Sequence, residues 1–414
     1  MNDIIENADW FHWQRKAQAL LSSNRIETGE HRYTRPAPTT YEQQWLWDSA
    51  FHAIVYRWFD GDMARDELLS AASHQLSSGP DAGMIPHMTY WEGGGRKLWG
   101  VEAHSMITQP PLLATAARLV YERTGERRLL EDLYPRLQRY HDWFERRRDP
   151  DDDHLVSLIH PWESGWDAAP RWDSLLGLEP FTHDRGKEAR EALAARLREH
   201  DYDAEALAEA GHFSVEPIDF NAIRAADLEA LAFIAAELGE TAAAERWQVT
   251  MHAVRRAVSE KMFGAQADDM AGDLAGADET FVGLESAAPF IALFGGCATL
   301  VQARRLVYRL QEPGFWRTFP VPTTLATSPA YTPDIYWRGN VWLPVNWLIY
   351  MGLRRYRYNH LARQLAARSL RLVAENDFWE YFNPDTGKGR GAAHQSWSAI
   401  VLDMLGQEQS AERA

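Results

Sequence analysis

Two carboxylates lie beside aromatic residues in loop-like segments of this 414-residue sequence. Asp167 follows a tryptophan in the segment HPWESGWDAAPRWD (160–173), and Glu380 lies between a tryptophan and a tyrosine. Apolar neighbours raise the pKa of a carboxyl group by desolvation, which suits a general acid that must stay protonated near neutral pH. Hydrolysis of a glycosidic bond needs such an acid and a second carboxylate that activates water. Asp167 and Glu380 are therefore candidates for an acid–base pair.

A structural role is the alternative for each of these two carboxylates. Either one could cap a helix or pair with Arg171, Arg338 or Arg390, and structural ion pairs also perturb pKa values. The sequence leaves this alternative open.

Three further acids are expected to bind or support rather than to transfer protons. Asp48 lies at the start of a predicted helix, where it is either an N-cap or a partner for sugar hydroxyls. Glu163 is expected to orient a loop, and Asp173 to do the same through Arg171.

The aromatic content of the sequence makes a carbohydrate site plausible. The sequence contains 18 Trp, 15 Tyr and 16 Phe, many of them beside Gly, Pro or Asp, and the apolar faces of sugars stack on such rings. The net charge of −16 argues against nucleic acid and anionic membrane surfaces as partners. A single cysteine, Cys297, excludes an intramolecular disulfide.

Several common sites and signals are not found in the sequence. His52, His87, His104, His160 and His394 do not have metal-ligand spacing, so we expect no metal and no cofactor. No Gly-x-Ser-x-Gly element occurs, and the three glycines at 93–95 lack the Lys-Ser/Thr ending of a phosphate loop, so we interpret 77–103 as a flexible flap. The sequence shows no signal-peptide pattern and no apolar run of about 18 residues. We expect a cytoplasmic protein.

Helical periodicity dominates the chain. One stripe, for example, consists of Leu130, Leu133, Leu137, Tyr140 and Phe144. The pattern predicts helices near 8–22, 47–59, 63–76, 107–125, 130–147, 219–238, 240–262, 283–293, 296–311, 339–353, 357–376 and 394–406, with a weaker one near 187–199. Four glycines are expected near helix ends: Gly125, Gly239, Gly295 and Gly352.

These helices predict an all-α fold, an (α/α)6 barrel of six helical hairpins in a ring. The barrel is expected to be one domain, 1–414, with loop insertions near 77–103 and 174–215. A helical solenoid is the competitor, but no sequence repeat is visible. Six unusual loops, each of which precedes an inner helix, would converge on one mouth of the barrel, at 41–52, 104–111, 160–173, 215–222, 331–347 and 378–398.

Three segments resemble glycoside hydrolase family 63. WESGWDAAPRWD resembles the general-acid segment of that family, WEYFNPDTGKG with HQSWSA its general-base segment, and YWRGNVWLPVNWLIY its Tyr-Trp-Arg-Gly-x-x-Trp signature. The resemblance extends from about residue 41 to residue 406. Larger members carry an additional N-terminal β-domain, for which this chain has no room. It therefore resembles the bacterial mannosylglycerate and glucosylglycerate hydrolases.

The resemblance implies a catalytic pair and a set of substrate contacts. Asp167 would be the general acid and Glu380 the general base of an inverting α-glycosidase that cleaves mannosylglycerate, and glucosylglycerate as a second substrate. Sugar contacts are implied for Trp47, Asp48, Gln109, Trp342 and Gln395. Contacts to glycerate are expected from Tyr41, Tyr90, Tyr336 and Trp337, with Arg338, or Arg96 and Lys97 of the flap, as the cation. We expect Trp162 and Trp166 to wall the sugar site.

Three other functions remain open from the sequence. One is an α-glucosidase that acts on oligosaccharides. Another is a sugar epimerase or isomerase on the same barrel, which would use a pair of histidines instead of Asp167 and Glu380. The third is a non-catalytic sugar-binding barrel. A homodimer is also open, because outer helices expose apolar residues.

Overall fold

Six inner helices form a closed ring. The computed structural model describes residues 4–264 and 271–411. Within these ranges each inner helix contacts the next, and the last contacts the first. The inner helices are α2 (Leu46–Tyr56), α5 (Leu113–Thr124), α9 (Ile218–Leu238), α11 (Ala292–Gly295), α13 (Leu343–Arg355) and α15 (Val401–Ala411). This ring confirms the predicted (α/α)6 barrel.

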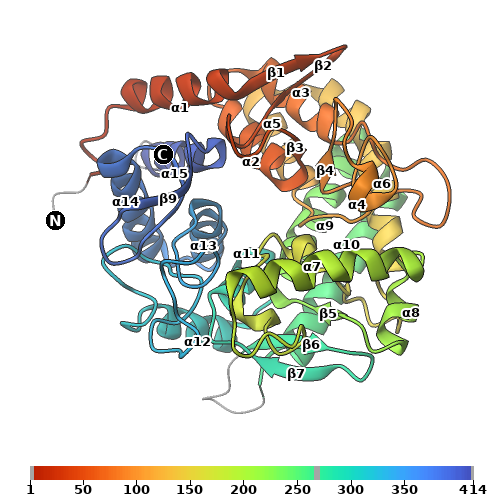
Figure 1. The fold of residues 1–414 in the computed structure, drawn as a ribbon. Helices are drawn as coiled ribbons and strands as arrows, with labels where there is room; N and C mark the ends of the chain where they lie inside the picture. The colour runs from red at the N-terminus through yellow and green to blue at the C-terminus, as the bar shows by residue number, and fades with distance from the viewer. Residues whose placement is uncertain (1–3, 265–270, 412–414) are drawn as a thin grey trace.

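An outer helix accompanies each inner one. The outer helices are α1 (Trp10–Asn24), α3 (Gly61–Ala71), α6 (Arg127–Arg147), α10 (Thr241–Lys261), α12 (Leu300–Leu310) and α14 (Asn359–Asn376). Helix α2 is buried along its whole length, whereas α6 buries a stripe that includes the five residues predicted for it. In Figure 1 the chain passes around the ring from red to blue, and α1 and α15 lie side by side. Among the described helices, none is long and apolar enough to cross a membrane.

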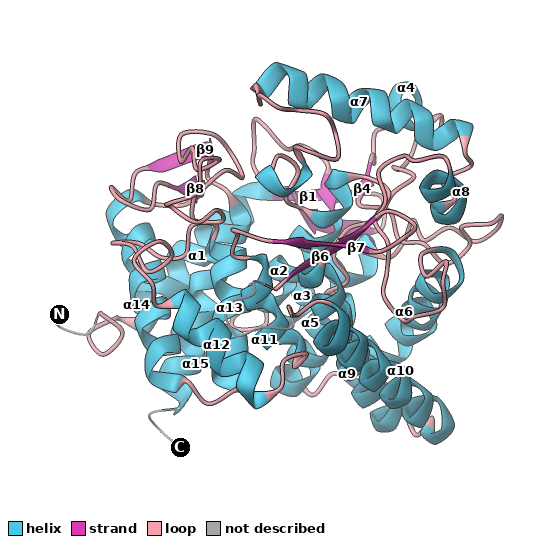
Figure 2. Ribbon diagram, turned by 90° about the horizontal axis from the view of Figure 1, so that it is seen from below, coloured by secondary structure: helices cyan, strands magenta, loops and turns pink. Residues whose placement is uncertain are grey.

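The irregular segments and short strands gather at one end of the barrel. Figure 2 shows this end with β8 (Trp379–Phe382) and β9 (Gly389–Ala393), and with α7 (His183–Glu199) crossing it. Helix α7 and α8 (Ala204–Glu209) form the insertion expected near 174–215. The flap carries α4 (Arg96–Trp99), which contacts α7.

Four small antiparallel sheets reinforce the loops. Hairpins are formed by β1 (Arg25–Thr28) with β2 (His31–Thr34), and by β8 with β9. The other two sheets pair segments distant in sequence, β3 (Gln44–Trp45) with β4 (Met88–Thr89), and β5 (Val215–Glu216) with β6 (Gly272–Ala275) and β7 (Thr280–Gly283). These strands are too short for an alternating pattern to reveal them in the sequence.

The fourth inner helix is shorter than predicted. A helix was expected over 283–293, but the chain forms strand β7 as far as Gly283, a 3-10 turn η3 (Ala288–Ile291), and only then α11. Residue Gly272 pairs with Gly283 in the hairpin, which commits these residues to the sheet. The end of α11 lies at Gly296, whose φ is +68°, one residue after the predicted Gly295.

Two of the predicted glycine caps are confirmed, and a third glycine has a different role. Gly125 and Gly239 end their helices with φ of +72° and +86°. Gly352 instead lies within α13, where a Cβ atom would be 2.7 Å from the Cβ of Leu293 and from the backbone nitrogen of Phe294. The glycine lets α13 pack closely against α11.

Candidate active site

The loop that carries Asp167 is held on three sides. Gly165, two residues earlier, has φ of +75°, and a Cβ atom there would be 2.6 Å from the ring of Trp47. Arg171 follows and donates two hydrogen bonds of 2.8 Å to Asp219 of α9. The indole of Trp172 donates to the carbonyl oxygen of Trp166 at 2.9 Å. The acid is thus placed by a loop with little freedom.

The surroundings of Asp167 keep its carboxyl group partly protonated at neutral pH. Burial raises its pKa to about 7, and the charge of Glu380 acts in the same direction. The positive charge of Arg190 opposes this shift. A carboxyl group with a pKa near 7 can donate a proton under physiological conditions.

Glu380 is held as a hydrogen-bond acceptor at the other side of the ring. It lies on β8 and is 3% exposed. Its Oε1 accepts a hydrogen bond from the hydroxyl of Tyr41 at 2.7 Å, and its Oε2 accepts one from the backbone N–H of Ala392 at 2.9 Å. A Cβ atom at Gly391 would lie 2.3 Å from Oε2, so a glycine is needed beside the carboxylate. Burial raises the pKa of Glu380, while the two donors oppose the rise.

Neither carboxylate has the structural ion pair that was the alternative explanation. Arg171 pairs with Asp219 and Asp273, Arg338 pairs with Asp173, and Arg390 pairs with Asp334. The expectation that Asp173 acts through Arg171 is therefore wrong. Glu163 does orient a loop, because it receives two hydrogen bonds from Arg148, at 2.8 and 2.9 Å, and one from the backbone N–H of Ile159.

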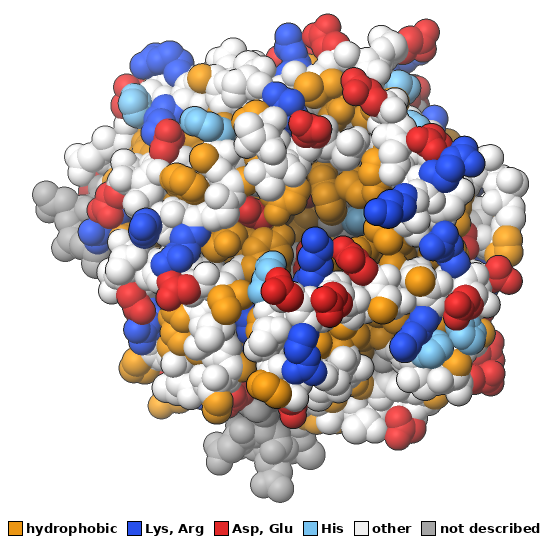
Figure 3. Space-filling view, viewed as in Figure 1, with side chains coloured by type: hydrophobic (Ala, Val, Ile, Leu, Met, Phe, Trp, Pro, Cys, Tyr) orange, Lys and Arg blue, Asp and Glu red, His pale blue; other side chains and the backbone are white. Residues whose placement is uncertain are grey.

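Asp167 and Glu380 line one cavity together with most of the expected sugar contacts. The cavity is narrow, with a volume of about 50 Å³. Figure 3 shows the face of the molecule onto which the barrel mouth opens, hollowed near its centre and rich in hydrophobic side chains. The lining residues are Pro36, Tyr41, Trp45, Trp47, Asp48, Gln109, Gly165, Asp167, Tyr336, Glu380, Gln395 and Trp397.

Two polar side chains in this cavity are suited to sugar hydroxyl groups. The Oε1 of Gln395 is buried and has no hydrogen-bond partner among the described residues. Asp48 is the third residue of α2 rather than its N-cap, which is Trp45. Burial raises the pKa of Asp48 well above its usual range, and the charge of Glu380 adds to the rise. Both groups gain from a polar ligand that donates hydrogen bonds.

Two expected aromatic contacts lie behind the cavity wall. Trp337 and Trp342 are buried and stack with their ring centroids 3.5 Å apart and their planes within 2°. Trp166 packs on the outer face of Trp337 at 5.2 Å. None of the three is among the cavity-lining residues. In this structure the three rings lie beneath the cavity walls and support them, while the contacts expected of Trp342 with the sugar and of Trp337 with glycerate stay predictions.

Arg338 is also directed away from the cavity. Its guanidinium donates to both carboxylate oxygens of Asp173, at 3.0 and 2.7 Å, and to the carbonyl oxygen of Ala168 at 3.3 Å. It also lies 3.8 Å from the ring centroid of Phe181. Arg338 therefore holds the acid loop, and the expectation that it binds the ligand is not supported by its contacts.

Two more expected contacts, Tyr90 and Trp162, lie on the rim formed by the flap. The hydroxyl of Tyr90 accepts a hydrogen bond of 3.1 Å from the indole of Trp99, whose ring also packs edge-on against Trp162 at 6.0 Å. Arg96 is exposed and paired with Glu102 at 2.9 Å. Tyr90, Trp162 and Arg96 do not line the cavity. Within the described residues, none of them forms a hydrogen bond with a side chain that does.

Arg190, which lies on α7, was not expected at the site from the sequence. The residue is 6% exposed, yet its side chain forms no hydrogen bond or ion pair with a described residue, and its Nε is buried without a partner. It is close enough to Asp167 to lower the pKa of that carboxyl group, and burial in turn lowers the pKa of the guanidinium. A signal was present in the sequence, because Gly186, Arg190, Leu193 and Leu197 form the buried stripe of α7.

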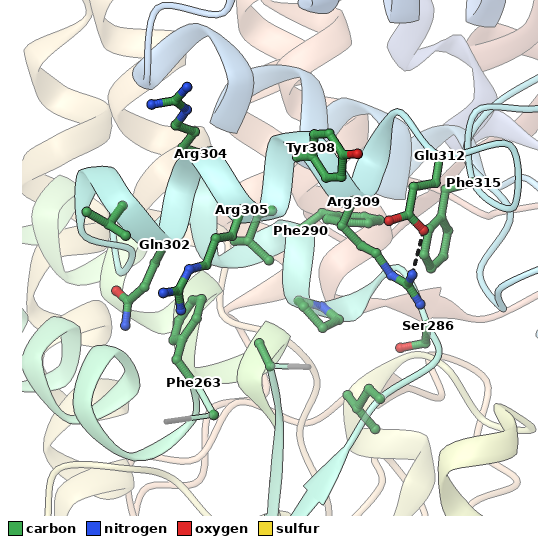
Figure 4. Close-up of a pocket in the computed structure, with 16 residues that line it drawn as sticks. Phe263, Ser286, Phe290, Gln302, Arg304, Arg305, Tyr308, Arg309, Glu312 and Phe315 are labelled. Atoms are coloured by element: carbon green, nitrogen blue, oxygen red, sulfur yellow. Dashed lines mark hydrogen bonds and ion pairs between the residues drawn. The ribbon is translucent and has the colours of Figure 1, made fainter. Parts of the chain in front are cut away.

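A second hollow lies beside α12, away from these loops (Figure 4). Arg304, Arg305 and Arg309 come from α12 and line it. Among the described residues, Glu312 is the single acidic residue in this lining, and it is paired with Arg309 at 2.5 Å. The described lining therefore offers no pair of carboxylates for the same chemistry.

Comparisons with known proteins agree with this geometry. Residues 41–398 match the "Mannosylglycerate hydrolase MGH1-like glycoside hydrolase domain". The chain is 34% identical to the mannosylglycerate hydrolase of one strain of Thermus thermophilus over 89% of this chain and 95% of that protein. It is 28% identical to the glucosylglycerate hydrolase of Mycolicibacterium hassiacum over 94% and 97% of the two chains.

The fold is also that of a solved relative. The crystal structure of the family 63 mannosylglycerate hydrolase from another strain of Thermus thermophilus, in complex with Tris and D-glycerate, superposes with a TM-score of 0.85. That chain is 31% identical, and the match covers 95% of this chain and 99% of the other. This chain therefore belongs to the MGH1-like glycoside hydrolases of family 63.

Proposed function

We propose that this glycoside hydrolase cleaves 2-O-α-mannosyl-D-glycerate, and glucosylglycerate as a second substrate, with inversion at the anomeric carbon. The single observation that carries the proposal is the cavity shared by Asp167 and Glu380, one held as a proton donor and the other as a hydrogen-bond acceptor. The activities named for the relatives supply the substrate class. One catalytic domain with its loop insertions suffices for this chemistry.

In this reaction Asp167 donates its proton to the glycosidic oxygen as the bond to the anomeric carbon breaks. Glu380 accepts a proton from a water molecule, whose oxygen attacks the anomeric carbon from the opposite face. The products are a free sugar of inverted configuration and glycerate, which keeps the proton from Asp167. Glu380 has already accepted two hydrogen bonds that favour its charged form, and its raised pKa makes it a better base than an exposed carboxylate.

Arg190 is our candidate for binding the carboxylate of glycerate. A buried guanidinium without an ion pair is costly unless an anion completes its environment. Its influence on Asp167 places it beside the acid, which is the side from which the leaving group departs. An α-glucosidase that acts on neutral oligosaccharides has no use for such a cation, so Arg190 favours glycerate over an oligosaccharide.

The sugar would bind among Asp48, Gln109 and Gln395, whose polar atoms line the same cavity as the catalytic pair. The cavity is narrow and walled by aromatic side chains, so we expect it to take one sugar with a small acid and we expect long oligosaccharides to be poor substrates. Mannose and glucose differ in one hydroxyl group, so one of these polar contacts would set the preference between them.

We also propose a localisation and an oligomeric state for the enzyme. A small solute as substrate and a net charge of −16 are consistent with a cytoplasmic enzyme that has no nucleic-acid partner. Leu300, Val301 and Tyr308 of α12 are exposed apolar side chains, at 82%, 63% and 75%, and a homodimer would cover them.

The proposal is tested by following the products with NMR. The enzyme is incubated with mannosylglycerate, glucosylglycerate and kojibiose, and spectra are recorded before mutarotation. We expect both glycerates to be cleaved, kojibiose to be cleaved poorly, and the β-anomer to appear first from the α-glycosides. First release of the α-anomer contradicts inversion, whereas efficient release of glucose from kojibiose favours the α-glucosidase.

A further inference from the structure

Four acidic side chains meet behind the acid loop, outside the cavity already described. They are Asp151, Asp153, Glu216 and Glu279, and one potential ligand atom from each lies within 4.8 Å of the others. The two aspartates come from the segment after α6, Glu216 ends β5, and Glu279 lies in the turn between β6 and β7. Three separate segments thus bring negative charge to one point.

Glu216 distinguishes this cluster from an ordinary acidic patch. Its side chain is 5% exposed, and its Oε2 is buried without a hydrogen-bond partner among the described residues. The other oxygen, Oε1, accepts one long hydrogen bond of 3.3 Å from the hydroxyl of Ser157. A buried carboxylate oxygen without a hydrogen-bond partner is destabilising unless a ligand completes its environment.

Among the described residues, Lys261 is the cation in ion-pair contact with this cluster, and the buried Arg224 also interacts electrostatically with Asp153. The ammonium group of Lys261 donates to Asp153 at 2.6 Å and to Glu279 at 2.5 Å. Within the described residues, Lys261 forms ion pairs with these two acids. One ammonium group therefore stands against four carboxylates. The cluster therefore keeps an excess of negative charge.

The segment after α6 also has the form of a calcium-binding loop. Its acids alternate as Asp149-x-Asp151-x-Asp153, followed by His154 with φ of +75°. In calcium loops of the D-x-D-x-D-G type, acids at the first, third and fifth positions precede a residue with this backbone conformation. Both oxygens of Asp149 accept backbone N–H groups, from Asp153 and His154 at 3.0 Å, which curls the loop toward the cluster.

We propose that this cluster is a calcium site. Carboxylate oxygens are hard ligands, which Ca²⁺ and Mg²⁺ prefer. One potential ligand atom from each of the four acids lies within 4.8 Å of the others, so one ion can contact all of them. Ca²⁺ accepts about 6–8 oxygen ligands, whereas Mg²⁺ usually keeps several water molecules and binds one or two carboxylates, so four carboxylates favour Ca²⁺.

Calcium at this point ties together the segments that support the catalytic acid. Leu158, on the segment that leads from the aspartates into the acid loop, exchanges two backbone hydrogen bonds of 2.6 and 3.1 Å with Val215 of β5. Asp151 and Asp153 precede this pairing on one segment, and Glu216 follows it on the other. The ion would join both segments to the turn between β6 and β7.

The test is a titration of EDTA-treated enzyme with CaCl2 and, separately, MgCl2, by isothermal calorimetry and thermal unfolding. We expect one Ca²⁺ per chain, a rise in Tm on adding Ca²⁺, and weaker binding of Mg²⁺. Glu216→Gln should weaken Ca²⁺ binding by at least about tenfold, because it removes the buried charged ligand. Without Ca²⁺, the Tm of this variant should equal or exceed that of the wild type, since the unpaired buried charge is gone.

Asp152→Asn is the matched control. Asp152 lies in the same loop and is exposed, and the change removes the same charge, but Asp152 is not among the four clustered acids. Its Ca²⁺ affinity should remain within about threefold of the wild type, because a surface charge is screened. If Glu216→Gln fails to fold, the exposed ligand Asp151 offers the same test through Asp151→Asn. The proposal is overturned if no saturable binding is seen at about 1 mM Ca²⁺. It is also overturned if Asp151→Asn and Asp152→Asn lose the same Ca²⁺ affinity.

Discussion

The hydroxyl of Tyr41 donates a hydrogen bond of 2.7 Å to Oε1 of Glu380, across 339 residues of sequence. The bond joins a loop before the first inner helix to a strand before the last one. Closure of the ring therefore also brings Tyr41 to its hydrogen bond with the base, Glu380. The same hydroxyl lies 3.4 Å from that of Tyr336, so two tyrosines surround the carboxylate on its cavity side.

Replacing Tyr41 is expected to change the pH dependence of the base. A hydrogen bond to the charged form lowers a pKa, and Tyr41→Phe removes it, so the pKa of Glu380 should rise. Loss of a hydrogen bond to a charged group is worth about 1.5–3 kcal/mol, so the acidic limb of kcat/KM should move upward by about one to two pH units. Tyr308→Phe, at an exposed position, should leave the profile unchanged. An unmoved acidic limb in Tyr41→Phe would argue against Glu380 as the base.

Removing either catalytic carboxylate should separate the two roles. Asp167→Asn and Glu380→Gln are each expected to lower kcat for mannosylglycerate by about 10²–10⁴-fold. The acid is not needed when the leaving group departs without a proton, so Asp167→Asn should retain most of its activity toward α-mannosyl fluoride. Glu380→Gln should lose activity toward both substrates, because the attacking water still needs a base. Steady-state kinetics with the two substrates measure this, and equal losses in both variants would contradict the assignment.

Arg190 should affect both substrate binding and the acid. Arg190→Gln removes the proposed partner of glycerate, so KM for mannosylglycerate should rise by about 10–100-fold, while KM for a neutral aryl α-mannoside should change little. The pKa of Asp167 is about 7 with the charge of Arg190 opposing its rise, so removing that charge should raise the pKa further. Activity falls as pH rises through that pKa, so the alkaline limb should move to higher pH in Arg190→Gln.

A matched control for Arg190 lies on the same helix. Arg196 is exposed on α7, and Arg196→Gln should leave both KM values and the alkaline limb unchanged. Equal increases in KM for the acidic and the neutral substrate in Arg190→Gln would mean that the residue supports the loop and does not bind the anion.

Much of the barrel could be predicted because its determinants are local. Apolar spacing identifies the stripe of α6, and a helix that is apolar on all sides, such as α9, indicates an inner position. The convergence of the loops then follows from the topology of the ring, which is why Asp167, Glu380, Asp48 and Gln395 could be expected in one place.

The orientation of individual side chains could not be predicted in the same way. Arg338 and Trp337 lie in a segment that does approach the cavity, but their orientation depends on partners far away in sequence, namely Asp173 and Trp166. Arg190 was missed for the opposite reason, because a long insertion brings a residue of α7 back over the mouth. The spacing of histidines, used to look for a metal site, does not reveal the alternating aspartates at 149–153.

Arg171 connects the acid loop to α9, and its loss should affect both stability and turnover. Its guanidinium is 2% exposed and paired with Asp219 and Asp273. Arg171→Met leaves two buried carboxylates without their cation, which should lower the free energy of unfolding by about 3–5 kcal/mol. Because the same bonds position Asp167, kcat should fall even at temperatures where the variant is folded. Urea unfolding and kinetics below the transition measure the two effects.

Arg128→Met is the control, since this side chain is 78% exposed, and its stability should stay within about 0.5 kcal/mol of the wild type. If Arg171→Met is as stable as the wild type, the ion pairs do not hold the loop. If its stability is unchanged but kcat falls, Arg171 acts by positioning the acid.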